Sequence, residues 1–392
     1  MFKNITRGVW ILSIISLLND ISSEMLYPVI PLYLKQIGYG TLLIGILEGI
    51  AECISGMTKI YVGSVSDTFQ RRTPFIQWGY FLSMLSRPII GLSSFVGLIF
   101  LGRSMDKIGK GIRTSSRDAL LADESTLQTR AEVFGFHRSM DTIGAVVGPL
   151  IAIIFLHFYP GNYQAIFLIT ILPGLFVLLF TFQLKDKNTE RVLSQKVSLK
   201  EHFSYYREAP KSYLSFLYIM LIFTFVNSSD IFLLLKAKES GMSESGVLTL
   251  YMCFNLVFAL FAFPVGKLAD RFGKIQMLII GLCVYGISYL AFAFTSNSWV
   301  IVGAFIFYGL FYAFTQGIIK VLFIEKVDAH KKSSAIGLYD GLNSFCLLIA
   351  NAVAGFVWYR FGSAYMLTYS GGISLLIAIY FLCLYPKKNP AI

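Results

Sequence analysis

The chain has 392 residues, of which 56% are hydrophobic and only 14% are charged. Soluble domains average about 25% charged residues, and the mean hydropathy of +0.67 also excludes an ordinary soluble protein. The net charge is +11, which suits either a nucleic-acid partner or a membrane topology with basic loops.

Apolar stretches of about 20 residues, the length that crosses a bilayer, follow one another along the chain. We therefore expect an all-α membrane protein with twelve transmembrane helices. The first stretch is longer than the apolar part of a signal peptide and contains charged residues, so we do not interpret it as a cleaved signal. The predicted spans are residues 8–34, 42–65, 74–96, 98–122, 131–158, 163–184, 213–236, 246–268, 274–295, 298–325, 333–358 and 363–385.

Lys and Arg residues gather in the loops on the side of the N-terminus. The opposite loops contain only Lys35, Lys236, Lys238 and Arg360. Because loops rich in Lys and Arg stay in the cytoplasm, both termini are predicted to be cytoplasmic, which agrees with an even number of spans. The positive net charge follows from this topology, and we expect no nucleic-acid partner.

The first predicted span contains Asn19-Asp20-Ile-Ser-Ser-Glu24. Asp20 and Glu24 are four residues apart, so they share one face of a helix. Two carboxylates at this spacing repel each other, which favours the uptake of a proton by one of them. The pair is therefore a candidate proton carrier, and the alternative is a static charge network.

The fourth predicted span carries an unusual run of charges: Arg103-Ser-Met-Asp106-Lys107-Ile-Gly109-Lys110-Gly111-Ile-Arg113-Thr-Ser-Ser-Arg117-Asp118. Its basic residues recur at helical spacing and share one face, with Arg113 beside it. Since a charge in hydrocarbon costs roughly 2.5–3.5 kcal/mol, this face must line a wet cavity or contact acidic helices. Gly109 and Gly111 would let an anionic ligand approach the backbone.

Two interpretations of the charges inside the spans remain open. Arginine side chains suit carboxylate or phosphate groups of a solute, but they equally suit ion pairs with Asp20, Glu48, Glu52 and Asp141. In a mixed case, some cations contact the substrate and the others are paired. The predicted substrate-binding residues are Arg103, Lys107, Lys110, Arg113, Arg117, Arg138 and Lys320.

Proton coupling is expected from carboxylates at membrane depth. Arg138 and Asp141 lie three residues apart in the fifth span, so protonation of the acid can be linked to anion binding by the base. The predicted proton-carrying residues are Asp20, Glu24, Asp141 and Asp340. No oxygen cage for sodium and no His-rich or Cys-rich motif stands out, so we expect no metal site, no cofactor and no catalytic residues.

The polar segment 185–212 separates two halves with related sequences. Gly63-Ser-Val-Ser-Asp67-Thr-Phe-Gln-Arg71-Arg72 recurs as Gly266-Lys-Leu-Ala-Asp270-Arg271-Phe-Gly273-Lys274. In the same register Asp123 lies opposite Glu325, and Arg138 lies opposite Asp340. We predict a six-helix bundle at 1–184, a cytoplasmic linker at 185–212 and a second six-helix bundle at 213–392.

The repeated motif resembles the signature of the major facilitator superfamily, Gly-x-x-x-Asp-(Arg/Lys)-x-Gly-(Arg/Lys)-(Arg/Lys). The first copy departs from it at Thr68 and Gln70. The resemblance implies two pseudo-symmetric bundles, alternating access around a central site, a monomer, and a gating loop whose charge pairs break on opening. The residues that it assigns to gating are Gly63, Asp67, Arg71, Arg72, Gly266, Asp270, Arg271 and Lys274.

We therefore expect a secondary active transporter in a bacterial cytoplasmic (inner) membrane, with a small organic anion and protons as its partners in the bilayer. A carboxylate siderophore or another metal chelate is one candidate, because aromatic residues crowd the eighth and tenth spans. The alternative is a multidrug/proton antiporter, which the cationic fourth span disfavours. A lipid flippase is a further possibility.

Overall fold

The computed structural model describes residues 5–69, 72–125, 130–186, 205–327 and 332–384, and the regular structure within these ranges is helical. The chain forms two compact units. The first contains the described residues of 1–39 and 50–201, and the second contains those of 40–49 and 202–392. Most of the predicted linker, 185–212, lies outside the described residues.

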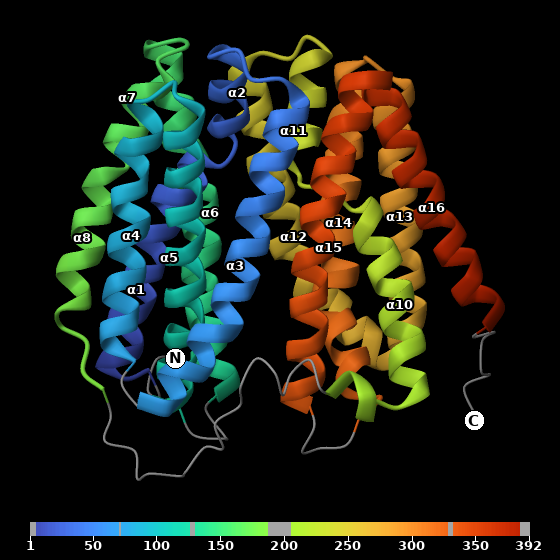
Figure 1. Ribbon diagram of the computed structural model, residues 1–392, viewed down its shortest axis with the longest axis horizontal. Helices are drawn as coiled ribbons and strands as arrows, with labels where there is room; N and C mark the ends of the chain where they lie inside the picture. Colours follow the sequence, from blue (N-terminus) through green and yellow to red (C-terminus); the bar gives the residue numbers. More distant parts are fainter. Residues whose placement is uncertain (1–4, 70–71, 126–129, 187–204, 328–331, 385–392) are drawn as a thin grey trace. The chain divides into compact units, whose positions relative to one another are not determined.

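The first unit is built from long helices whose apolar stretches are interrupted at two points (Figure 1). The first break lies at Pro28, which lacks a backbone N–H and so cannot continue the hydrogen bonds of the preceding helix. The second lies at Thr170. The helices are α1 (Arg7–Leu26), α2 (Val29–Gln36), α3 (Thr41–Phe69), α4 (Thr73–Gly91), α5 (Val96–Asp123), α6 (Arg130–Phe158), α7 (Tyr163–Ile169) and α8 (Ile171–Thr181). The start of α3, up to residue 49, belongs to the second unit.

The second unit repeats this pattern with a break between its first two long helices. At the break, the backbone N–H of Ser229 donates to Asn351 Oδ1 at 2.7 Å, which satisfies a donor that the interrupted helix leaves unpaired. The helices are α10 (Lys211–Val226), α11 (Ile231–Glu239), α12 (Glu244–Phe272), α13 (Lys274–Phe294), α14 (Ser298–Ile324), α15 (Lys332–Phe361) and α16 (Ser363–Leu384).

Equivalent helices pack in the same way within each unit. α1 packs on α6 and α4 on α5 in the first unit, and α10 packs on α15 and α13 on α14 in the second. The closest approach of α4 and α5 requires glycine, because a Cβ atom at Gly109 would lie 2.5 Å from the carbonyl oxygen of Gly79. A Cβ atom at Gly111 would likewise lie 2.7 Å from Thr58 Cβ of α3. The two glycines serve helix packing, so the expectation that they admit a ligand to the backbone is wrong.

The surface and the helix lengths are those of a membrane protein. Among the described residues, ten helical stretches are long and apolar enough to cross a membrane. α4 and α5 coincide with the third and fourth predicted spans but are not among the ten, and α5 carries the run of charges. Large apolar side chains such as Trp78 and Leu101 are more than half exposed. The all-helical multi-pass class is confirmed, whereas the count of twelve spans stays a prediction.

Candidate substrate-binding site

A cavity of about 310 Å³ lies within the first unit. Its walls come from α1, α4, α5 and α6, with one residue each from α2 (Ile30) and α7 (Phe167). The basic residues of α5 line it because their helical spacing turns them to one side of the helix. All the predicted substrate-binding residues except Lys320 contribute to the lining: Arg103, Lys107, Lys110, Arg113, Arg117 and Arg138.

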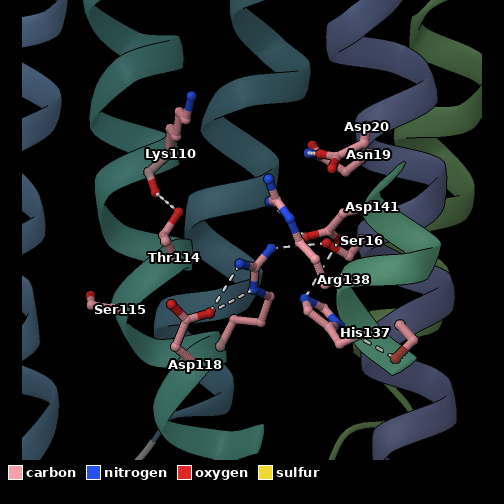
Figure 2. Close-up of polar contacts among 12 residues, drawn as sticks. Ser16, Asn19, Asp20, Lys110, Thr114, Ser115, Asp118, His137, Arg138 and Asp141 are labelled. Carbon is pink, nitrogen blue, oxygen red and sulfur yellow. Dashed lines mark hydrogen bonds and ion pairs between the residues drawn. The ribbon is translucent and has the colours of Figure 1, made fainter. Parts of the chain in front are cut away.

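Four of these cations contact a carboxylate of the same unit. Lys107 is bonded to Glu52 of α3. Arg103 lies 3.8 Å from Asp106, Arg117 lies 3.0 Å from Asp118, and Arg138 lies 3.8 Å from Asp141. Arg117 also donates to Ser16 Oγ of α1 at 2.9 Å (Figure 2). Some of the basic residues that share one face of α5, the basic stripe, thus form the structural charge network that the sequence left open as an alternative.

Arg113 differs, because no carboxylate of the described chain pairs with it. Its side chain is 5% exposed, its Nη1 donates to Ser83 Oγ of α4, and its Cζ lies 5.1 Å from the centre of the Tyr80 ring. Asp20 and Asp106 line the same cavity and act on Arg113 electrostatically, but neither forms an ion pair with it. The charge of this buried guanidinium is therefore only partly compensated.

Lys110 is a second cation that lines the cavity and forms no ion pair with a described residue. Its backbone carbonyl accepts a hydrogen bond from Thr114 at 2.7 Å, while the ammonium group extends away from that contact and is bonded to no described residue (Figure 2). The side chain is exposed and lines the cavity. It is therefore free to follow a ligand, as a flexible point charge does.

The predicted proton-carrying residues of the first unit line the same cavity. Asp20 and Glu24 come from α1 and Asp141 from α6. Asn19 Nδ2 donates to Asp20 Oδ1 at 3.1 Å, so the carboxylate is held by a neutral donor (Figure 2). The acids and the cations that could respond to their protonation thus share one wet space.

His137 contacts Asp141 but does not line the cavity, and the sequence analysis gave it no role. Its Nε2 lies 3.6 Å from Asp141 Oδ1, and its Nδ1 lies 3.3 Å from Ser13 Oγ. The side chain is 4% exposed. Its four-residue spacing from Asp141 was the signal in the sequence, since residues at this spacing meet on a helix face.

Lys320 and Asp340 lie in the second unit and do not line this cavity. Lys320 Nζ lies 3.8 Å from Asp340 Oδ2, so these two predicted site residues pair with each other. Elsewhere in the second unit, Asp230 accepts hydrogen bonds from Tyr308 Oη at 2.5 Å and Tyr312 Oη at 3.0 Å. Tyr308 is completely buried, so much of the aromatic residue cluster in this unit is packing core.

The repeated motif begins on helices rather than in loops, because α3 continues to Phe69 and α12 to Phe272. Arg72 Nε lies 3.7 Å from Asp123, and at the matching place in the second unit Lys274 is bonded to Glu325.

Among the other predicted gating residues, those that the structure describes form no ion pair with a described residue. Arg271 stacks on Phe272 with its Cζ 5.2 Å from the ring centre, and Gly266 has open space at its Cβ position. Arg71 and the side chains of Asp67 and Asp270 lie outside the described residues, and so does the surrounding of Gly63.

Apolar helices that enclose a charged cavity, in one of two sequence-related units, define a multi-pass membrane transporter. The sequence profile of the Major Facilitator Superfamily matches residues 12–249 and 214–392. The chain therefore belongs to this superfamily of secondary transporters, and the resemblance seen in the sequence is confirmed.

Relatives and solved structures agree with this assignment. An uncharacterised MFS-type transporter of Methanocaldococcus jannaschii is 31% identical over 91% of this chain and 89% of its own length. The class B tetracycline resistance protein of Escherichia coli is 20% identical over 84% of this chain and 83% of its own length. The crystal structure of the nucleoside transporter NupG is 14% identical, covers 98% of this chain and 100% of its own, and has a TM-score of 0.79. At that identity it shows the fold alone.

Proposed function

We propose that the protein moves a small organic anion across the membrane by alternating access, with protons as the coupling ion. The observation that carries this proposal is Arg113, which is buried, lines the cavity and meets no carboxylate of the described chain. A buried charge without an ion-pair partner is unfavourable. An anionic ligand would supply the missing charge through charge-assisted hydrogen bonds to the guanidinium.

The size of the cavity narrows the kind of anion. Ligand pockets commonly measure about 300–1,000 Å³, so a cavity of about 310 Å³ favours a compact metabolite. A carboxylate siderophore or another metal chelate is a larger anion and fits this proposal only if part of it lies outside the cavity.

Proton coupling is supported by the acids that share the cavity. Asp20 and Glu24 of α1 and Asp141 of α6 face Arg113 and Arg138 there. When these carboxylates take up protons, they stop compensating the cations, so an anion binds more tightly. We expect anion affinity to rise as the pH falls, and Asp20→Asn to remove part of that dependence. An unchanged pH profile in Asp20→Asn would exclude Asp20 as the coupling residue.

A multidrug/proton antiporter is the second candidate. Its support is the similarity to the tetracycline resistance protein and the aromatic residues beside Asp230 in the second unit. Aromatic rings with a carboxylate suit an amphiphilic cation. The cationic cavity of the first unit favours the anion transporter.

The experiment that tests the proposal is thermal stabilisation of the purified protein by a panel of ligands. The panel contains polycarboxylates, phosphorylated metabolites and lipophilic cations, because a ligand that binds the folded protein raises its unfolding temperature. We expect stabilisation by one class of anion, loss of that effect in Arg113→Ala and its retention in Lys320→Ala. Stabilisation by lipophilic cations alone, equal in both variants, would favour the antiporter.

The orientation and the gating assignments belong to the same proposal. We infer that both termini are cytoplasmic, that the membrane is the bacterial cytoplasmic membrane and that the protein acts as a monomer. The matching pairs Arg72–Asp123 and Lys274–Glu325 support a gating role for the repeated motif, because ion pairs at helix ends are suited to breaking and re-forming as helices move.

A further inference from the structure

Arg87 of α4 is a cation of the cavity to which the sequence analysis gave no role. It is 4% exposed and lines the same cavity as Arg113. Its Nη1 donates to Ser22 Oγ of α1 and, at 2.9 Å, to the backbone carbonyl of Thr170. No carboxylate of the described chain lies within ion-pair distance of it.

Arg87 and Arg113 are held in the same way. Each guanidinium has Nη1 anchored by a buried serine, Ser22 for Arg87 and Ser83 for Arg113. The remaining N–H groups of both side chains donate to no described protein acceptor, and none is among the enclosed polar atoms that lack a partner. They therefore face the cavity. A guanidinium that is already fixed loses little conformational entropy when it binds a ligand.

We infer that the charged group of the substrate is a dianion, of the phosphate monoester or dicarboxylate type, held by Arg87 and Arg113 together. The inference rests on the proposed anion transport and adds the charge of the substrate. A single carboxylate has one charge and satisfies one guanidinium fork. It would leave the second buried arginine without an ion-pair partner, which is unfavourable.

The acids of the cavity are consistent with this charge. Asp20 and Glu24 line it beside Arg87, Lys110 and Arg113. In the proton-coupled cycle these carboxylates carry protons while the anion is bound, so the charge of the three cations then exceeds that of Asp106, which lines the same cavity. A phosphate monoester carries a charge of about −1.5 to −2 at neutral pH with three acceptor oxygens, and a dicarboxylate carries two separate charges.

The test compares probe ligands that differ by one charge and little in size. Binding to the purified protein is measured at neutral pH for methyl phosphate against dimethyl phosphate, and for succinate against monomethyl succinate. We expect the dianion of one pair to bind about tenfold or more tightly than its monoanion, the effect of roughly one charge-assisted hydrogen bond. The pair that shows the preference identifies phosphate or dicarboxylate chemistry.

Variants of Arg87 then test the residue itself. Arg87→Gln is expected to bring the dianion-to-monoanion preference close to one while monoanion binding persists, and Arg87→Lys is expected to restore part of the preference. Because Arg87 also joins α1 to Thr170, Ser22→Ala serves as the control for loss of that anchor. It should keep most of the preference, since the charge remains.

Three outcomes distinguish failure of the dianion inference from failure of the proposed anion transport. Equal binding of monoanions and dianions by the unmodified protein would overturn the dianion inference and leave anion transport intact. An unchanged preference in a folded Arg87→Gln protein would remove Arg87 from the site. Absence of binding by every anion in the panel, with lipophilic cations bound, would reject the proposed function itself.

Discussion

The two units share a helix arrangement but differ in the charge that it carries. In the first unit α4 and α5 carry Arg87, Arg113 and Lys110 on the wall of a cavity. In the second unit the equivalent pair, α13 and α14, packs fully buried tyrosines such as Tyr285 and Tyr308 against each other. Packing requirements are met in both units, whereas buried arginines without an ion pair line a cavity in the first unit. The difference indicates that helix packing determines the fold. The charge of the cavity depends on a few basic residues on one helix pair, where the equivalent pair has tyrosines.

A second contrast concerns how the equivalent helices begin. The start of α4 is capped by Asp186, whose Oδ1 accepts hydrogen bonds from the backbone N–H groups of Arg72 and Thr73, both at 2.9 Å. α13 begins after Gly273, whose φ of +100° permits a direct turn out of α12. The first copy of the motif has Gln70 in place of this glycine. The departure from the family signature thus coincides with a different way of starting the helix.

The largest expected effect concerns the helix contact that brings α5 against α4. Gly109→Ala places a Cβ atom 2.5 Å from a backbone carbonyl oxygen, so we expect a loss of about 3 kcal/mol in the free energy of unfolding, or no folded protein. The matched control is Gly317→Ala in α14, where nothing lies within 4 Å. Thermal unfolding in one detergent measures both. Equal midpoints would show that the close approach of α4 and α5 is not required.

An intermediate effect is expected from the paired cations. Glu52→Gln leaves Lys107, which is 3% exposed, without its carboxylate. We expect a loss of about 2 kcal/mol, less than for a fully buried pair because the Glu52 side chain is one-third exposed.

The matched pair in the second unit is more exposed, so Asp340→Asn should cost less than about 1 kcal/mol. Both variants are measured by the shift in unfolding temperature, and a larger loss in Asp340→Asn would reverse the comparison. Glu52→Gln should also bind the anion more tightly, because it frees one more cation.

The smallest effect is expected at the start of the helices. Asp186→Ala removes the acceptor of two backbone N–H groups of α4 and should cost about 1 kcal/mol. Gly273→Ala forces a side chain into a left-handed conformation and should cost a similar amount. If Asp186→Ala unfolds at the temperature of the unmodified protein, solvent replaces the carboxylate at no cost and the contrast has no energetic meaning.

The sequence predicted the parts of the structure that depend on local spacing. Apolar length gave the helices, and the spacing of Lys107 and Lys110 in the stripe placed their side chains on one wall. It could not decide which cations are paired, because Lys107 meets Glu52 through the packing of α5 on a helix far away in the chain. Arg87 is the one charged residue of its predicted span, so no spacing in the sequence indicated a role for it. Its position on the cavity wall is seen only in the structure.

The same limit explains the wrong expectation about the two glycines and the position of Lys320 away from the cavity. Gly109 and Gly111 fit ligand access and helix packing equally well in the sequence, and only the position of α3 and α4 distinguishes the two. Lys320 was grouped with the cavity because it is a lone base in an apolar span, whereas its partner, Asp340, comes from the next helix. Contacts between helices are not encoded by the period of either helix.

The most direct test of the account is calorimetric titration of the anion selected from the panel into Arg113→Gln and into Lys320→Gln. Both changes remove one positive charge from a helix, but Arg113 lines the cavity and forms no ion pair, whereas Lys320 is paired in the second unit. The account predicts that Arg113→Gln weakens binding about 10-fold to 100-fold, while Lys320→Gln leaves it within about twofold. Equal weakening in both variants, or none in Arg113→Gln, would contradict the placement of the anion site in the first unit.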